Sequence, residues 1–203
     1  MADKIPLFPL EVVLFPGALL PLHIFEPRYR QMIAQCLANK EEFGVVLAAD
    51  KGLASVGCTA EILKVLTDYP DGRKDIITIG KRRFRLLELL EDLPYLQVHV
   101  EWLALAADPA PRESGSLRDA YTRAYRLAYG RAPDPPDSGP DESVAFQMAQ
   151  SLPLTIEFKQ QLLQEDDELA RRQQLEERLA ELLPQLVSRD ALRRRSRGNG
   201  HPA

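Results

Sequence analysis

The sequence contains few of the residues that build covalent or metal-bound frameworks. Its 203 residues include two cysteines, three histidines and one tryptophan. Cys36 and Cys58 lack the spacing of a zinc site, and each is expected to be a small core residue. Neither a run of eighteen apolar residues nor a basic, apolar leader is found. These absences predict a cytoplasmic protein that does not contact a membrane.

The usual signatures of catalysis are also missing. Neither G-x-S-x-G nor H-E-x-x-H occurs, and the three histidines are widely separated. Gly80-Lys81 resembles the end of a phosphate-binding P-loop, but the required earlier glycine is replaced by Asp75 and the lysine is followed by Arg82. We therefore predict no catalytic residues, no metal and no cofactor. The protein should hydrolyse neither ATP nor GTP and should cleave no peptide.

Charge is distributed unevenly along the chain. The net charge of −4 includes residues 189–203, which carry five arginines against one acid and so contribute +4. The rest of the chain therefore carries −8, and an acidic body disfavours binding to a nucleic-acid backbone over a broad face. We interpret the basic end as a solvated helix end whose cations complement the helix dipole.

The apolar stretch at residues 4–25 is interrupted by prolines at positions 6, 9, 16 and 21. Proline is excluded from helix interiors and donates no hydrogen bond to a sheet, so this stretch predicts short strands and turns. Pro27 suits the first turn of a helix, and Tyr29, Met32 and Ile33 follow at helical spacing.

Further strands are predicted from short apolar or alternating runs. Residues 43–49 read as a buried strand, and residues 56–66 and 75–89 read as a hairpin around the turn Tyr69-Pro70-Asp71-Gly72. Residues 95–102 alternate, which predicts a buried face with Val98 and Val100 and a solvated face that includes Tyr95 and Gln97.

Composition changes beyond Trp102, where β-branched residues become scarce and Ala, Leu, Glu, Gln and Arg dominate. Leucines at helical spacing predict that the second half is helical, with the last helix carrying Leu175, Leu179, Leu182 and Leu186. We expect a β domain over residues 1–104, a helical subdomain over 116–195 and a disordered basic tail over 196–203. Together, these parts predict a protein of the α+β fold class.

Five short motifs follow one another along the first half of the chain. They are I-P-L-F-P-L at residues 5–10, V-G-x-x-A-x-I at 56–62, P-D-G at 70–72, G-x-x-R-x-R at 80–85 and Y-L-x-V at 95–98. In order and spacing they resemble the Lon substrate-binding domain, the N-terminal module of ATP-dependent Lon proteases. The resemblance covers residues 5 to about 102, and the helical remainder is similar in character with weaker motifs.

The resemblance implies a PUA-like twisted β pseudo-barrel with one embedded helix, followed by an all-helical C-terminal subdomain. It also implies recognition of polypeptide. Because the sequence contains neither a P-loop ATPase module nor a Ser-Lys protease module, we interpret the chain as a stand-alone Lon-domain protein. Its expected function is that of a non-catalytic polypeptide-binding module, an adaptor in protein quality control, with unfolded or degron-bearing polypeptides or a protein partner as ligands.

Two candidate sites follow from this interpretation. A polypeptide site would use an apolar groove or a free strand edge near Phe15, Pro16 and Gly17, with Phe25 and Tyr29 as further contacts. The same aromatic residues also suit a barrel core, so both roles remain open. The alternative function is RNA binding, since PUA-like barrels of other families hold RNA. That role would use the basic cluster of Lys81, Arg82, Arg83 and Arg85.

Overall fold

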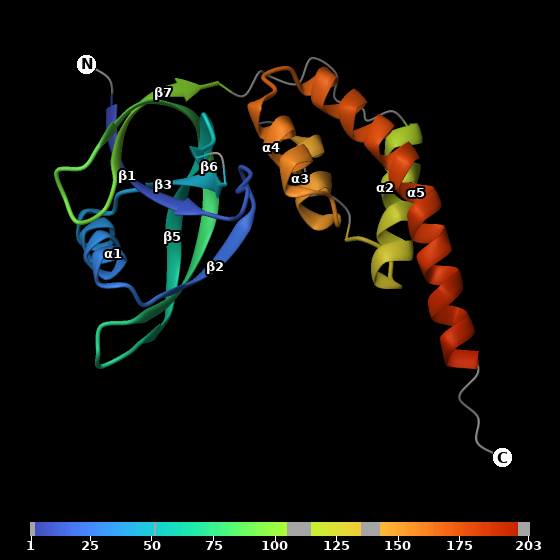
Figure 1. The fold of residues 1–203 in the computed structure, drawn as a ribbon, viewed down its shortest axis with the longest axis horizontal. Coiled ribbons are helices and arrows are strands. Elements are labelled where there is room, and N and C mark those ends of the chain that lie inside the picture. Colours follow the sequence, from blue (N-terminus) through green and yellow to red (C-terminus); the bar gives the residue numbers. More distant parts are fainter. Residues whose placement is uncertain (1–2, 51, 105–114, 135–142, 199–203) are drawn as a thin grey trace. The chain divides into compact units, whose positions relative to one another are not determined.

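The computed structural model describes residues 3–50, 52–104, 115–134 and 143–198 (Figure 1). The chain divides into two units, the first comprising residues 1–105 and 156–166 and the second comprising residues 106–155 and 167–203. The first unit contains β1 (Asp3–Leu10), β2 (Leu19–Ile24), α1 (Pro27–Asn39), β3 (Phe43–Ala49), β4 (Gly52–Leu53), β5 (Val56–Asp68), β6 (Lys74–Leu90), β7 (Gln97–Leu103) and α4 (Ile156–Gln164). The second contains α2 (Gly115–Tyr129), α3 (Val144–Ser151) and α5 (Glu168–Gly198).

The strands of the first unit close into a barrel. Their order is β1-β7-β6-β5-β3, and β1 also pairs with β3, in parallel, so that the first and last strands of the series meet. The other pairings of the sheet are antiparallel. Leu7, Val46, Phe84, Val98 and Val100 form a buried cluster inside. Every strand in the described part of the chain ends before residue 104, and the α+β class predicted from the sequence is confirmed.

A three-stranded extension of the barrel, which we name the arm, consists of β2 and the parts of β5 and β6 that form their hairpin, residues 61–68 and 74–80. Strand β2 pairs with β6 from Leu19 opposite Ile79 to Ile24 opposite Lys74. The hairpin reaches down from the barrel in Figure 1, with β2 beside β6. Its turn includes Gly72 at a φ of 86°, a conformation that glycine adopts without strain.

Gly80 of β6 lies beside the residues that precede β2, where the two backbone segments approach closely. The Gly80 amide donates to the Ala18 carbonyl at 2.9 Å, and the Gly80 carbonyl accepts from the Gly17 amide at 2.9 Å. A Cβ atom at position 80 would lie 2.1 Å from the Phe15 carbonyl oxygen, so only glycine fits. Gly80, which resembled part of a P-loop in the sequence, therefore allows β6 to approach the Phe15–Ala18 turn closely.

Helix α1 is the embedded helix, and it corrects one expectation for β7. The predicted stripe is buried, with Tyr29, Met32 and Ile33 facing the core. Tyr95 was expected on a solvated face, but it is almost fully buried and its hydroxyl donates to the Gln35 side chain of α1 at 2.8 Å. Gln97 is buried as well. The prediction was wrong for Tyr95 because this residue lies in the loop before β7 and reaches α1, a long-range contact that alternation along a strand does not reveal.

Helix α4 belongs to the β-containing unit, although the sequence grouped it with the C-terminal helices. Its Gln160 side chain donates to the Val56 carbonyl of β5 at 2.9 Å. Arg83 of β6 ties the end of the helix to the barrel. Its guanidinium donates to the carbonyls of Leu163, Glu165 and Ala104 and to the Asp166 carboxylate, all within 2.8 to 2.9 Å.

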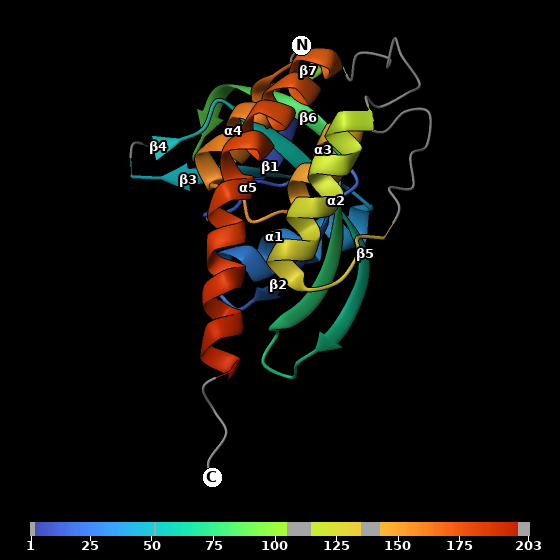
Figure 2. The same ribbon diagram turned by 90° about the vertical axis from the view of Figure 1, so that its right-hand side faces the viewer.

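In the second unit, α2 and α5 run side by side in both ribbon views (Figures 1 and 2). Of the leucines predicted for the last helix, Leu175, Leu179 and Leu186 of α5 are buried and Leu182 is partly exposed. Leu117 and Tyr121 of α2 are buried as well. Glu168 at the start of α5 is also buried and accepts hydrogen bonds from Arg171, Arg172 and Ser143. Helix α5 continues to Gly198, into the segment expected to be a disordered tail, and residues 199–203 lie outside the described residues.

None of the helices in the described ranges is both long enough and apolar enough to span a membrane.

Candidate functional site

The structure separates the five residues proposed for polypeptide binding. Phe15 is 1% exposed, and Tyr29 is buried with its ring stacked on Phe8 at a centroid distance of 4.0 Å. Both therefore belong to the core. Gly17 is exposed and Pro16 partly so, at the turn that approaches β6. Phe25 is 58% exposed at the end of β2 and is the one aromatic side chain of the five that a ligand can reach.

Phe25 continues a row of side chains on the outward face of the arm. Cross-strand pairs of an antiparallel sheet share a face. Leu19 opposite Ile79, Pro21 opposite Ile77 and His23 opposite Asp75 therefore point the same way, while Ile24, Ile76 and Thr78 on the other face are buried. We name this outward surface the arm face; its members are Leu19, Pro21, His23, Phe25, Leu63, Leu66, Ile77 and Ile79.

Leu63 and Leu66 join the arm face because of two bulges in β5. The register shifts between Ile62 and Lys64 and again between Val65 and Thr67, so each bulge places two β5 residues opposite one residue of β6. Leu63 then lies beside Lys64, opposite Ile77, and both are exposed. Leu19, Leu63 and Leu66 are 64%, 51% and 54% exposed. The sequence analysis missed all three. For Leu63 and Leu66, the signal in the sequence was the interruption of alternation at residues 62–67.

The hairpin end of the arm face is polar. His23 Nδ1 and Asp75 Oδ1 are 2.6 Å apart, and the Tyr69 hydroxyl donates to Asp75 Oδ2 at 2.7 Å. The hydrogen bond from His23 is the main cause that lowers the pKa of Asp75, and the bond to Asp75 raises the pKa of Tyr69. The His23 ring also stacks with Phe25 at 5.9 Å. This network holds the aromatic end of the face in place.

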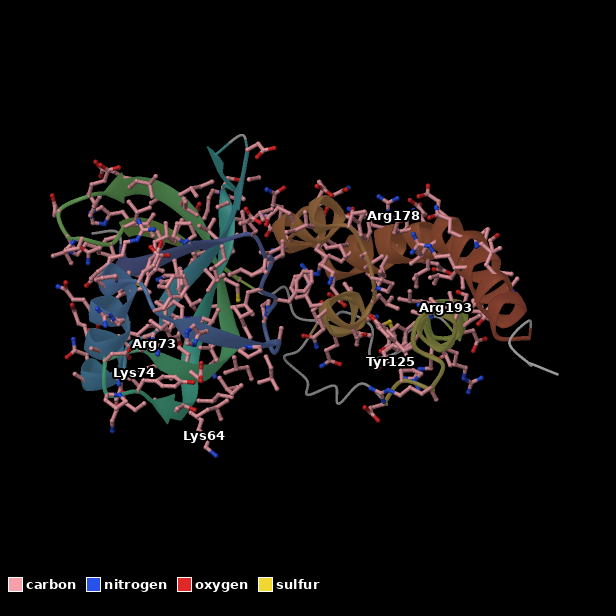
Figure 3. The ribbon with its side chains drawn as sticks, turned by 60° about the horizontal axis from the view of Figure 1, so that its bottom comes forward. Lys64, Arg73, Lys74, Tyr125, Arg178 and Arg193 are labelled. Carbon is pink, nitrogen blue, oxygen red and sulfur yellow. The ribbon has the colours of Figure 1, made fainter. Side chains whose placement is uncertain are left out.

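Cations line the same end of the arm. Lys74 pairs with Asp68 at 2.6 Å, and the Arg73 guanidinium lies 5.0 Å from the centre of the Tyr69 ring. Lys64 projects away from the arm into solvent, while Arg73 and Lys74 lie nearer the hairpin turn (Figure 3). The arm face thus carries apolar side chains on all three strands, with the polar β5 side chains of Glu61, Lys64 and Thr67 beside them, and paired charges at its tip.

The four candidate RNA-binding cations do not form one surface. A shift in register between Cys58 and Ala60 places an extra β6 residue at the level of Lys81 and Arg82, and both of these side chains are exposed. Arg83 next to them is buried against α4. Arg85 is partly exposed.

Each of these cations also has an acidic partner. The four ion pairs are Lys81 with Glu61 at 3.1 Å, Arg82 with Glu42 at 3.6 Å, Arg83 with Asp166 at 2.9 Å and Arg85 with Glu101 at 2.7 Å. Arg82 additionally lies over the Trp102 ring at 3.8 Å. A phosphate backbone would have to displace these carboxylates, so the cluster offers little uncompensated positive charge.

Cys36 and Cys58 are buried and pack in the core. Both cysteines are free and buried, and burial raises the pKa of Cys36 to about 12 and raises that of Cys58 as well. A raised pKa keeps both thiols protonated at neutral pH, which disfavours a nucleophilic role. Within the described ranges, no three His, Cys, Asp or Glu side chains lie in an arrangement that could hold a metal ion.

Comparison with protein families finds a match over most of the chain. Residues 4–183 match the model of the ATP-dependent protease La (LON) substrate-binding domain. Among characterised proteins, the Lon protease of Parabacteroides distasonis is 34% identical over 146 residues, which are 67% of this chain and 18% of that protein. The Lon protease of Geobacter metallireducens is 26% identical over 198 residues, 87% of this chain and 24% of that protein. The matched region is thus at most about a quarter of these relatives.

Solved structures agree with the family match. A Lon N-terminal domain protein from Xanthomonas campestris superposes with a TM-score of 0.68 at 30% identity, covering 85% of this chain and 96% of that one. The N-terminal domain of a Lon protease from the Mycobacterium avium complex gives a TM-score of 0.58 at 17% identity, covering 88% and 98%. The second likeness supports the fold alone.

Proposed function

The chain belongs to the ATP-dependent protease La (LON) substrate-binding domain family, and from this premise we propose that it is a non-catalytic module that binds polypeptide segments through the arm face. The observation that carries the proposal is the exposure of Leu19, Phe25, Leu63 and Leu66 on one surface of the β unit. A row of exposed apolar residues on an otherwise charged protein is typical of an interaction surface. Its expected ligands are unfolded or degron-bearing polypeptides, which would make the chain an adaptor in protein quality control.

Side-chain burial, rather than strand addition, should supply most of the affinity. Strand β2 pairs with β6 on one side, and in the described part of the chain no strand pairs with its other edge. Pro21 lies in the middle of this edge strand and has no N–H to donate. On the edge of β5, the two bulges interrupt regular pairing. An incoming segment would therefore gain little from main-chain hydrogen bonds.

The expected affinity is modest. Complete burial of four Leu or Phe side chains would contribute about 6 to 12 kcal/mol. Association costs about 4 to 15 kcal/mol in lost translational, rotational and conformational freedom. These terms nearly balance, so a single segment should bind weakly and dissociate quickly. Such binding suits a module that samples many unfolded chains.

RNA binding is the second candidate function, and the pairing of Lys81, Arg82, Arg83 and Arg85 with carboxylates weighs against it. The two functions differ in salt dependence. Binding through apolar burial should change little between low and physiological salt and should show a negative heat-capacity change. Binding to phosphates should weaken by orders of magnitude over the same range, because counterions are released from the RNA.

We expect the double variant Leu19→Ser, Phe25→Ser to weaken binding of a reduced, alkylated, permanently unfolded model protein at least about tenfold, because two of the largest apolar contacts are lost. Fluorescence anisotropy titrations at low and physiological salt measure the effect, with a structured RNA hairpin titrated in parallel. Both residues are exposed, so the melting temperature should change little.

The matched control is Val12→Ser, Leu169→Ser, which removes two exposed apolar side chains elsewhere and should leave the affinity unchanged. Equal loss in both double variants would show that the arm face is not the site. Tight, salt-sensitive binding of the RNA, abolished by charge reversal at Arg82 and Arg85, together with no affinity for the unfolded protein, would replace the proposal with the alternative function.

A further inference from the structure

Arginine is concentrated in two segments of the second unit, the end of α2 with the residues that follow it and the end of α5. Residues 123–134 and 187–198 contain eight arginines, two aspartates and no lysine, and so carry +6. Since the net charge of the chain is −4, the rest carries −10. The match to the family model ends at residue 183, so the arginines of α5 lie beyond it. Membership of the family therefore does not explain them.

On α2, two arginines and a tyrosine lie on one exposed side of the helix. Arg123, Arg126 and Tyr129 follow at spacings of three residues, which keeps them on neighbouring turns of that side. Both arginines are exposed, and within the described ranges neither has an ion pair or a hydrogen bond. Asp119 is the acid on the same side, one turn before Arg123. Tyr129 is 49% exposed, and its ring contacts that of Tyr125 at a centroid distance of 4.7 Å.

Helix α5 brings further arginines to the same end of the second unit. It runs beside α2 in the same direction and continues past the end of α2 (Figures 1 and 2). Arg189 and Arg193 follow Leu186 at spacings of three and seven residues, so they continue the buried leucine stripe of α5, the side that faces its neighbouring helices. Figure 3 shows Arg193 on the side of α5 nearer to α2. Arg189 is exposed and has no ion pair among the described residues.

We name this surface the basic end. Its members are Arg123, Arg126, Tyr129, Arg131, Arg189 and Arg193. The helix dipole attracts cations only in the last turn of a helix, so it does not account for Arg123. The basic end also differs from the cluster at residues 81–85, where every cation has a carboxylate partner.

The composition of the basic end suits phosphate groups and bases together. Arginine presents a planar fork of N–H donors that binds a phosphate through two hydrogen bonds, whereas lysine acts as a point charge. An exposed aromatic ring among arginines offers a surface on which an unpaired base can stack. Bases in a duplex are already stacked on each other, so Tyr129 favours a single strand.

We propose that the basic end binds single-stranded nucleic acid, with its arginines on successive phosphates and one base stacked on Tyr129. Charges more than about 8 to 10 Å away are largely screened at physiological salt. The acidic remainder of the chain therefore permits a short site here, although it disfavours binding over a broad face. The function is additional to polypeptide binding at the arm face and uses none of its residues.

Fluorescence anisotropy of the full chain with a labelled oligo(U) of about 12 nucleotides should show binding at low salt. If four phosphates are neutralised, the affinity should fall about fiftyfold between about 50 and 200 mM salt, because each contributes about −0.7 to the logarithmic salt slope. Oligo(dT) of the same length should behave alike, since it offers the same phosphodiesters and unpaired bases.

Arg123→Glu, Arg126→Glu should weaken this binding at least about tenfold at low salt and should make the salt slope shallower by about 1.4, because two phosphate contacts are lost. The control Lys4→Glu, Lys40→Glu makes the same change in net charge at two exposed residues of the first unit and should leave the affinity unchanged. The melting curve followed by circular dichroism should be the same for both variants, because all four residues are exposed.

Tyr129→Ala should weaken binding at least about fivefold at every salt concentration with the slope unchanged, because a stacked base is lost and no charge is removed. Tyr129→Phe keeps the ring and should bind like the wild type. Binding of the unfolded model protein at the arm face should survive all of these substitutions.

Several results would overturn the proposal. They are no binding of oligo(U) at low salt, equal loss in the arginine variant and its control, and loss on charge reversal at Arg82 and Arg85 but not at Arg123 and Arg126. Displacement by poly-glutamate as effective as that by unlabelled oligo(U) of equal charge would instead assign the basic end to acidic polypeptides.

Discussion

Arg83→Ala is expected to destabilise the first unit by about 3 to 5 kcal/mol, the range found when one partner of a buried charged network is removed. The Arg83 side chain is almost fully buried and donates to three backbone carbonyls, those of Leu163, Glu165 and Ala104. Each buried carbonyl left without a donor costs about 1 to 3 kcal/mol. The change should therefore release α4 from the barrel as well as lower stability.

Trp102 provides a probe of this unit, because it is the single tryptophan of the chain and lies on β7. Urea unfolding followed by its fluorescence should show a lower midpoint for Arg83→Ala. Arg85→Ala is the matched control, since Arg85 is partly exposed and its ion pair with Glu101 should contribute about 0 to 1 kcal/mol. Asp166→Ala should also have a small effect, because that carboxylate is 61% exposed and the three carbonyls retain their donor. A loss for Asp166→Ala equal to that for Arg83→Ala would contradict this explanation.

Glu168→Ala is expected to destabilise the second unit by about 3 to 5 kcal/mol. The Glu168 side chain is 1% exposed and accepts hydrogen bonds from Arg171 at 2.9 Å, Arg172 at 3.0 Å and the Ser143 hydroxyl at 2.6 Å. Its removal takes the counter-ion from two buried guanidinium groups. The Ser143 hydroxyl, which also accepts from the Phe146 amide and begins α3, would lose its acceptor.

Circular dichroism at 222 nm reports this change, because the second unit consists of helices in the part of the chain that is described. Since the two units can unfold separately, the helical signal and the Trp102 fluorescence should be analysed as distinct transitions. Glu177→Ala on the exposed side of α5 is the control and should change stability by less than about 0.5 kcal/mol. Replacing Glu168, Arg171 and Arg172 together by apolar residues should recover part of the loss. If the triple variant is no more stable than Glu168→Ala, the buried charges are not the cause.

Local pattern was sufficient for most elements of the fold. Prolines predicted the short strands of the opening, and leucines at helical spacing predicted the buried stripe of α5, which the structure confirms. It was not sufficient for helix α4. The sequence of α4 resembles that of its helical neighbours, and only the bonds from Arg83 and Gln160 place it with the barrel.

The candidate sites were less predictable, because neighbouring residues of one type have different surroundings. Phe15 and Phe25 are both aromatic residues of the opening segment, yet one is core and the other is exposed. Arg82 and Arg83 are adjacent arginines of β6, and the alternation of the strand places the first in solvent and the second against α4. A register shift of one residue exchanges the faces of a strand, and nothing in the two residues themselves encodes it.

By itself, the sequence determined the α+β class, the boundary between strands and later helices near Trp102, and the resemblance to the Lon substrate-binding domain. These properties depend on periodicity, proline positions and motif order, which are local along the chain. The tertiary structure decided which apolar and charged side chains are available to a ligand. Availability depends on what covers each face, and the covering elements, such as α1 over Tyr95 and α4 over Arg83, come from distant parts of the sequence. The arm face with Leu19, Leu63 and Leu66 emerges only when β2, β5 and β6 pair.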